Sequence, residues 1–479
     1  MDKFSSKDNI SRISIIGQFL FWIAVILLFI TAYPVYKGEG YIYLLFTVLS
    51  HLLLYLGFRK NAIFFDTFIG IFLWLGFWLK FSIRIAFMDG QFPVTAIGAF
   101  DNSAAEFDLA LLVSSCGFLG LIVASYLREK YWFVYPSKIT EVKQQGLFEL
   151  FKQYRKVILF LFVVFFLAVA LLNFYFGIYQ RGTISETNLP FGLNGVFKWL
   201  LLFGLASFSA ILLRFEYITK NTTSYLVAIV ALLEAFVSNV SLLSRGMILN
   251  VSGLMYGVFK GFKLHGIKVK LRFIVVCGVI FIILFGSSVF AVNYMRASNF
   301  SDDPTNFSNS DLLSKTSRST SRLFLDRWVG IEGVMSVSSY QEKGWHLWKQ
   351  AWQEKYVGSG TSYYDTHLIT SPYNKKDMTK HHFISLPGII AFCFYPGSFI
   401  FLFLCMVLVS VFASAIEILI FKLGGMNVIL CSLLAQVMAF RFASFGYVPA
   451  QSYLLFGTIV ISIALICFFD KLLTIWSKD

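Results

Sequence analysis

The sequence predicts an all-α, polytopic helical membrane protein with about 12 transmembrane helices and one large outward-facing loop domain. Of its 479 residues, 57% are hydrophobic and 14% are charged, which leaves too few polar residues to cover a soluble protein of this length. Many apolar runs approach the ~20 residues that a helix needs to cross a bilayer. These runs are continuously apolar rather than alternating, so they do not fit the strands of a membrane β-barrel.

The order of these runs divides the chain into three regions. Residues 1–294 hold nine predicted spans, residues 295–386 form the large loop with amphipathic helices, and residues 387–479 hold the last three spans. The apolar stretch 387–396 is too short to span and is expected to re-enter the membrane, where burial in protein satisfies its backbone groups. The predicted spans are 14–33, 41–56, 62–87, 107–127, 157–176, 196–213, 222–238, 242–259, 273–294, 399–421, 426–440 and 453–469.

The distribution of Lys and Arg predicts the orientation. More than half of the 40 basic residues fall in segments that are cytoplasmic if the N-terminus is cytoplasmic, whereas the outward stretch 89–106 has none. Basic loops tend to stay on the cytoplasmic side. Both termini are therefore predicted inside and the large loop outside. These loops also account for the net charge of +14, so we expect no nucleic-acid partner.

The stretch NVSLLSRGMILN, residues 239–250, places Arg245 about one turn inside a predicted span, on its outer side. A charge at the centre of a membrane helix costs roughly 2.5–3.5 kcal/mol, and less near the edge, where Arg can extend to the headgroups. One interpretation is an arginine that reaches the headgroups or pairs with Glu234. The other is an anion-binding site at the outer leaflet.

Other outward cations favour the anion-binding interpretation. Lys80 and Arg84 are spaced i, i+4 and share one helix face at the outer end of a predicted span, and Arg441 ends another span at the same level. Several cations at one depth suit a diphosphate, because guanidinium groups match phosphate oxygens. Arg181, in a polar loop, is not expected to share this site.

The large loop contains the stretch SRSTSRLFLDRWVGIEG, residues 317–333. Read as a helix, it places Arg318, Arg322 and Asp326 on one face at i, i+4 and i+8. A solvated helix with an Arg–Asp pair would explain this pattern. Alternatively, the two arginines bind phosphate, and Asp326 or Glu332 acts as a general base toward a sugar hydroxyl.

A second stretch of the loop, GWHLWKQAWQEKY at 344–356, repeats aromatic residues along one helical stripe. The stripe fits a helix lying in the membrane interface, where aromatic side chains sit at headgroup level. It also fits a platform on which sugar rings stack, and the two roles are compatible. Its aromatic residues are Trp345, Trp348, Trp352 and Tyr356.

The histidines and cysteines do not predict a metal site. Four of the six histidines lie in the large loop without zinc-ligand spacing, and the six cysteines show neither a disulfide framework nor metal-ligand spacing. We therefore expect no metal and no cofactor. His367, two residues after Asp365, is an acid/base candidate. The sequence lacks a P-loop and a dinucleotide fingerprint. No loop predicted inside is long enough to form a domain, so nothing indicates a cytoplasmic nucleotide-sugar site.

Many hydrophobic spans, one large outward loop late in the chain and outward arginines together resemble a known family. The layout is similar to that of the Wzy-type O-antigen or oligosaccharide repeat-unit polymerases, GT-C-like membrane glycosyltransferases of bacteria. The resemblance covers most of the chain, and the stretch FLDRWVGIEG, residues 324–333, also looks similar to segments of these polymerases. The related O-antigen ligases share the layout.

The resemblance implies transfer between glycans linked to undecaprenyl diphosphate at the periplasmic face of the bacterial inner membrane, for lipopolysaccharide or a similar surface polysaccharide. Donor and acceptor would both be lipid-linked, with membrane lipid and a chain-length-regulating co-polymerase as further partners. The diphosphate is a built-in leaving group, whose charge outward cations would stabilise. The alternatives are an O-antigen ligase-type transferase and a lipid-linked oligosaccharide transporter or flippase, although transporters usually contain internal repeats, which we do not find.

Overall fold

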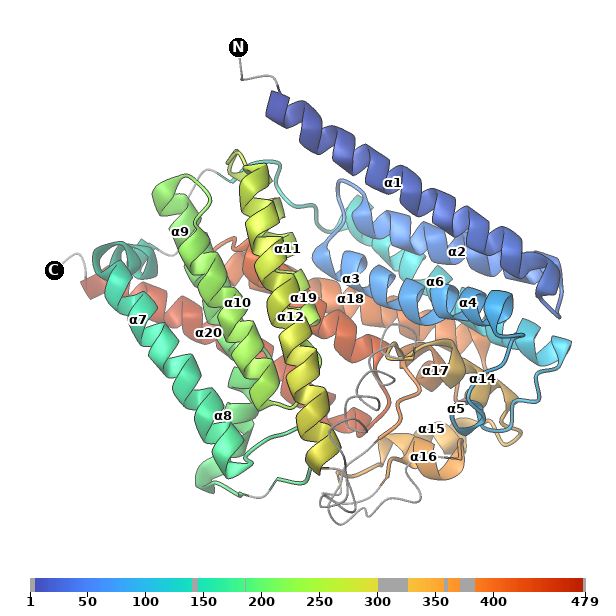
Figure 1. Ribbon diagram of the computed structural model, residues 1–479. Helices are drawn as coiled ribbons and strands as arrows, with labels where there is room; N and C mark the ends of the chain where they lie inside the picture. Colours follow the sequence, from blue (N-terminus) through green and yellow to red (C-terminus); the bar gives the residue numbers. More distant parts are fainter. Residues whose placement is uncertain are drawn as a thin grey trace.

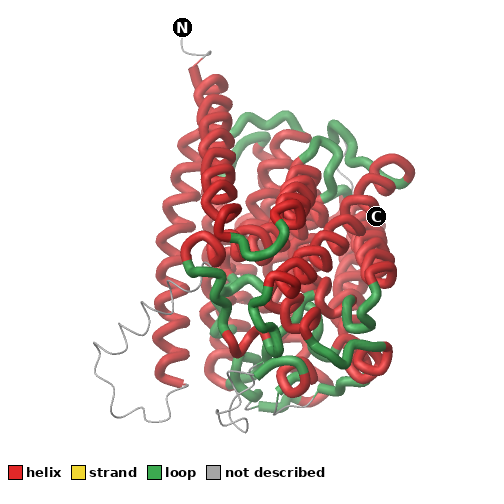
Figure 2. The backbone as a smooth tube through the Cα atoms, turned by 90° about the vertical axis from the view of Figure 1, so that its right-hand side faces the viewer, coloured by secondary structure: helices red, strands yellow, loops and turns green. Residues whose placement is uncertain are grey.

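The computed structural model describes residues 5–139, 145–185, 187–299, 326–356, 361–370 and 384–476. Throughout these ranges the chain forms helices joined by loops, without a β-strand (Figures 1 and 2). Nine helical stretches of the described chain are long and apolar enough to cross a membrane. The protein is therefore a polytopic helical membrane protein, as predicted.

The nine stretches agree with nine of the predicted spans. Two of them are helix pairs joined by a short π-helical stretch, Trp74–Leu79 in the first pair and Leu200–Gly204 in the second. The helices are α1 (Ser5–Ala32), α2 (Gly40–Phe58), α3 (Phe64–Leu73) with α4 (Lys80–Phe87), α6 (Ala104–Tyr131), α7 (Gln145–Phe176), α8 (Leu193–Trp199) with α9 (Leu205–Lys220), α12 (Leu271–Asn299), α18 (Phe399–Leu423) and α20 (Ser452–Trp476).

The other three predicted spans also form helices, but they are not among the nine. They are α10 (Tyr225–Ser241), α11 (Met247–Leu264) and α19 (Val428–Ala443). α19 lies at the centre of the bundle, where α3, α9, α11 and α18 surround it. Its burial explains why a short helix suffices there, since it is covered by protein rather than by lipid. Twelve spans therefore remain a prediction.

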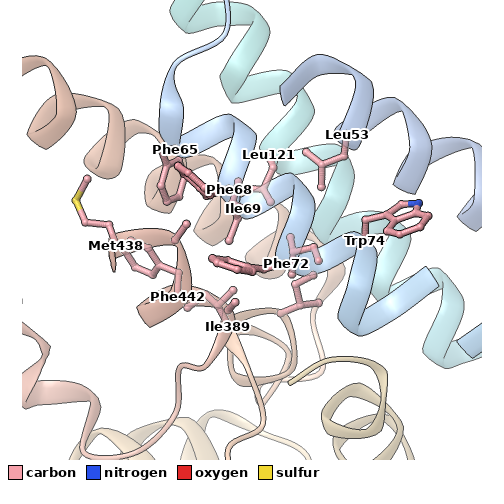
Figure 3. Packing of buried hydrophobic residues seen from close by; sticks show 14 of the residues in the cluster. Leu53, Phe65, Phe68, Ile69, Phe72, Trp74, Leu121, Ile389, Met438 and Phe442 are labelled. Atoms are coloured by element: carbon pink, nitrogen blue, oxygen red, sulfur yellow. The ribbon is translucent and has the colours of Figure 1, made fainter. Parts of the chain in front are cut away.

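Aromatic side chains fill the core around α19. Phe65, Phe68 and Phe72 of α3 point toward Met438 and Phe442 of α19, and Ile389 closes the cluster from another segment (Figure 3). Between helices in a membrane, close van der Waals packing of such side chains, rather than exclusion of water, holds the helices together. This core therefore fixes α3 against α19, and with α3 it fixes α4, which continues α3 through the π-helical stretch.

Five short helices lie between or beyond the long ones. α5 spans Val94–Ile97, α14 Ile331–Ser339, α15 Trp345–Trp352, α16 Tyr363–His367 and α17 Ile389–Cys393. α14 and α17 are buried in the same core cluster as the long helices, and α14 contacts α6. The segment that the sequence assigns to a large loop is therefore partly built into the bundle.

The short apolar stretch at 387–396 is a buried turn of helix. Its backbone groups are satisfied by protein, as its prediction required: the Gly388 N–H donates to the Phe445 carbonyl at 2.9 Å. Gly388 adopts φ +84°, a conformation that favours glycine. Whether the stretch lies at membrane depth remains a prediction.

Candidate functional site

Four of the predicted site residues meet along α4. Lys80 Nζ lies 3.0 Å from Glu332 Oε1, and Arg84 Nη2 lies 2.5 Å from Asp326 Oδ1. Lys80 also donates to the Trp328 carbonyl at 2.5 Å. Predicted diphosphate-binding cations are thus paired with predicted catalytic carboxylates, and the two ion pairs fix the segment 326–332 on α4.

The backbone of this segment touches the helix directly. A Cβ on Gly330 would lie 1.9 Å from the Gly76 carbonyl oxygen, so only glycine fits at this position. The Trp328 ring stacks on Phe72 with centroids 6.0 Å apart. Gly76 belongs to the π-helical stretch, and such stretches recur at functional sites because they redirect the residues that follow.

The helical interpretation of residues 317–333 is wrong for Asp326. Residues 326–330 are not helical, and α14 begins only at Ile331, because Gly330 has an extended backbone and the segment is held by contacts with α4. Arg318 and Arg322 lie outside the described residues. Glu332 is in the first turn of α14.

Arg327, which sequence reasoning did not single out, lies between the two paired carboxylates in the chain. Burial lowers the pKa of its guanidinium to about 10, helped by the nearby positive charges of Arg181 and Arg245. It remains a cation at neutral pH. None of the ion pairs between described residues involves Arg327, Arg181 or Arg245. We call these three residues the arginine cluster.

Two loops are tied together to build the arginine cluster. The Arg181 N–H donates to the Leu242 carbonyl at 3.0 Å, which joins the loop after α7 to the loop before α11. Arg296, in the last turn of α12, donates to both loops, at 2.9 Å to the Leu243 carbonyl and at 3.2 Å to that of Arg181. Leu243 has φ +49°, a strained conformation for leucine that such contacts must maintain.

The sequence predicts Arg245 inside a helix, and this prediction is wrong. Arg245 lies in the connection between α10 and α11, two residues before α11 begins, because residues 242–246 form a hydrogen-bonded turn. The predicted alternative, a pair with Glu234, does not form: Glu234 Oε1 accepts from Ser238 instead. Burial lowers the pKa of Arg245, and its Nε has no hydrogen-bond partner among the described residues.

Arg441 occupies the last turn of α19, as predicted. Its Nη2 donates to Ser452 Oγ at 3.1 Å, and its guanidinium lies 5.8 Å from the centre of the Phe445 ring. The ring centroids of Phe72 and Phe440 are 5.8 Å apart, and Phe72 also stacks on Trp328. Along the chain, Arg441 directly follows Phe440, and Arg327 directly precedes Trp328. Arg441 therefore has polar partners of its own.

The predicted aromatic stripe forms α15 and ends with that helix at Trp352, so Tyr356 lies outside it. Trp348 packs on Phe392 and Phe401, with centroids 4.8 Å and 5.0 Å away. Trp345 also contacts Phe401 but is 59% exposed, and Trp352 is 39% exposed. Trp348 thus has a packing role, whereas the outer rings are open to lipid or ligand.

His367 is the last residue of α16 and is exposed. Its ring stacks on Tyr363 with centroids 4.1 Å apart, and its Nδ1 contacts Thr366 Oγ1 at 2.7 Å. No contact among the described residues joins His367 to the arginine cluster or to the ion pairs on α4. Over the described part of the chain, no group of His, Cys, Asp or Glu has the arrangement of a metal site.

Comparison with known proteins identifies no relative. No protein-family model matches the chain, and no curated protein or solved structure is significantly similar to it.

Proposed function

We propose that the protein is a membrane glycosyltransferase of polymerase type that joins oligosaccharide repeat units linked to undecaprenyl diphosphate. The observation that supports this function is the arginine cluster. Burial lowers the pKa of Arg327, Arg181 and Arg245 lie near enough for their charges to lower it further, and none of the three forms an ion pair with a carboxylate of the described residues. A diphosphate would relieve their mutual repulsion and accept hydrogen bonds from their planar donor groups.

The roles of the side chains follow from their contacts. The arginine cluster binds the donor diphosphate and stabilises the charge that develops as it leaves, with Arg441 beside it. An oxygen of the acceptor sugar attacks the anomeric carbon of the donor, and the bond from this carbon to the diphosphate oxygen breaks. Asp326, whose side chain is 40% exposed, takes the hydroxyl proton while Arg84 orients it. Glu332, held by Lys80, positions the segment.

The proposed location is the bacterial inner membrane, with both termini in the cytoplasm and the arginine cluster at the periplasmic face. Trp345 and Trp352 would contact the sugar units of the bound glycan. The reaction as proposed uses no nucleotide, because cleavage of the bond between the anomeric carbon and the diphosphate drives it. A ligase would use the same chemistry on a different acceptor.

Glycan analysis of a strain that lacks this chain tests the proposal. We expect single repeat units on the lipid anchor, and restoration of long chains by the parent gene but not by Arg327→Ala. Long chains retained on undecaprenyl diphosphate would indicate a ligase. Repeat units that accumulate on the cytoplasmic leaflet would indicate a flippase.

A further inference from the structure

One carboxylate joins three segments that are distant in the sequence. Glu354 lies two residues after α15, and its Oε1 accepts from the Tyr363 N–H, at the start of α16, at 2.6 Å. Its Oε2 accepts from the Val448 N–H, in the loop between α19 and α20, at 2.7 Å. Both bonds are short, as charge-assisted hydrogen bonds are. None of the ion pairs between described residues involves Glu354, so backbone donors hold its charge there.

The loop end of this bridge is a strained residue. Val448 has φ +41°, in the left-handed region, which is a costly conformation for a β-branched side chain. Such a conformation persists only where the surrounding contacts maintain it. Val448 is buried, and the bond from its N–H to Glu354 is one of these contacts. Loss of the carboxylate would therefore allow the peptide group between Tyr447 and Val448 to rotate.

The same peptide group reaches Arg441 on its other side. The Tyr447 carbonyl accepts from Arg441 Nη2 at 3.4 Å, and this nitrogen also donates to Ser452 Oγ at 3.1 Å. The peptide thus presents its N–H to a carboxylate and its C=O to a guanidinium group. Hydrogen bonds that are linked in this way polarise and strengthen one another. Rotation of the peptide would remove one of the two acceptors that hold this guanidinium nitrogen.

Arg441 is the residue through which such a rotation would affect the proposed reaction. Tyr179 lies near enough to Arg441 to act on it electrostatically, and it stands two residues before Arg181 of the arginine cluster. We propose that Glu354 is a positioning residue, which holds Arg441 through the peptide group 447–448 in the orientation that glycosyl transfer needs. This role rests on the proposed function, in which Arg441 helps to stabilise the leaving diphosphate.

Polymerisation kinetics of Glu354→Gln, in liposomes supplied with the lipid-linked repeat unit, test this role. Glutamine offers one acceptor oxygen to two N–H donors, so the substitution loses one of the two bonds. We expect kcat to fall roughly tenfold with little change in KM, because Arg441 acts on the charge that develops as the diphosphate leaves. Glu39→Gln, which changes an exposed carboxylate just before α2, is the matched control and should keep the parental kcat.

A double variant separates action through Arg441 from a general loss of structure. Arg441→Lys should itself lower kcat, and Glu354→Gln should add little to that loss, because the residue through which it acts is already changed. Losses that multiply would contradict the role, as would a parental kcat in Glu354→Gln. Hydrogen exchange gives a readout besides activity: the Val448 amide should exchange about tenfold faster in Glu354→Gln than in the parent. An unchanged exchange rate would also overturn the role.

A glycine at position 448 keeps the test decisive if Glu354→Gln does not fold. Val448→Gly retains the N–H and adopts a positive φ without strain, so the comparison is then made in that background. Glu354→Gln should still lower kcat there, and an unchanged value would contradict the role. A folded parent that makes no polymer contradicts the proposed function and this role together. A parent that polymerises beside an equally active Glu354→Gln contradicts only the role of Glu354.

Discussion

At the scale of single residues, the cations at this end of the bundle are of two kinds, those paired with a carboxylate and those without an ion pair among the described residues. Lys80 and Arg84 are paired with carboxylates, whereas Arg181, Arg245 and Arg327 have no ion-pair partner among the described residues. Like charges that lie near one another in a partly buried site repel. Holding three such groups together is costly, so we interpret the cluster as a binding site that an anion completes.

Replacing Arg327 tests this interpretation. Loss of a hydrogen bond to a charged group costs roughly 1.5–3 kcal/mol, which corresponds to about one to two decades in rate. We expect Arg327→Ala to lose this much polymerising activity, and Arg327→Lys to lose much of it because the planar fork is gone. Arg245→Ala and, contrary to the expectation from sequence, Arg181→Ala should behave similarly. Chain-length analysis on a gel measures the effect.

Lys37→Ala is the control for these variants, since Lys37 is an exposed cation in the loop before α2, predicted on the same side. It should keep parental chain lengths. Parental chain lengths in Arg327→Ala, at matched protein levels, would remove the cluster from the mechanism.

The Lys80–Glu332 pair should act on stability rather than on chemistry. Both side chains are largely buried, at 3% and 13% exposure, and removal of one partner from a buried pair costs about 3–5 kcal/mol. Glu332→Gln should therefore lower the melting temperature of the purified protein, and Lys80→Met combined with Glu332→Gln should recover much of the loss. An unchanged melting temperature with abolished activity would instead make Glu332 the general base.

At the scale of elements, α15 combines an anchoring face with an open one. Trp348 is wedged between Phe392 and Phe401, which belong to α17 and α18. Trp352 reaches Phe445 at 6.4 Å, and Phe445 carries the Arg441 guanidinium over its ring. A single ring, that of Phe445, therefore separates Trp352 from the Arg441 guanidinium.

Leucine substitutions separate the two roles of α15. Trp348→Leu should lower thermal stability, since packing of a large aromatic is lost at roughly 1–3 kcal/mol. Trp352→Leu keeps apolar area but removes a ring face on which a sugar can stack, so activity should fall several-fold with little change in stability. Equal activity of Trp352→Leu and the parent would leave α15 as an interfacial anchor.

The elements were more predictable than their contacts. Apolar runs located the helices, because the bilayer demands about 20 apolar residues whatever the tertiary structure. The sequence predicts a span that starts at residue 242, but α11 starts at Met247, because the apolar residues Leu242 and Leu243 belong to a turn. The pairs of α4 with segment 326–332 join residues about 250 positions apart, and no local pattern encodes such a contact. Arg327 was not predicted, because a helix over residues 317–333 would place it off the face that carries Arg318, Arg322 and Asp326.

At the scale of the whole molecule, the two ends of the bundle differ in chemistry. One end carries the arginine cluster and the aromatic helix α15. The other end, where α11 ends and α12 begins, carries the exposed residues Lys263 and Arg272; Figure 1 shows the course of these helices. The excess of Lys and Arg in the second group of loops predicts that this end faces the cytoplasm. The arginine cluster would then face outward, where a lipid-linked glycan is presented.

Single cysteines test this orientation. Lys355→Cys, exposed beyond α15, should react with a membrane-impermeant thiol reagent in cells whose outer membrane has been permeabilised. Lys152→Cys, exposed on α7, should react only after the inner membrane is lysed. The reverse labelling pattern would invert the topology and place the arginine cluster in the cytoplasm.

Polymerisation by the purified protein tests the central claim most directly. The full-length chain, reconstituted in liposomes, is given an undecaprenyl-diphosphate-linked repeat unit without nucleotide or added metal. The account predicts a ladder of products that differ by one repeat unit, with one undecaprenyl diphosphate released for each new bond, and a ladder shortened or lost in Arg327→Ala. A folded parent protein that yields neither ladder nor free undecaprenyl diphosphate, or an Arg327→Ala protein that yields the parental ladder, would contradict it.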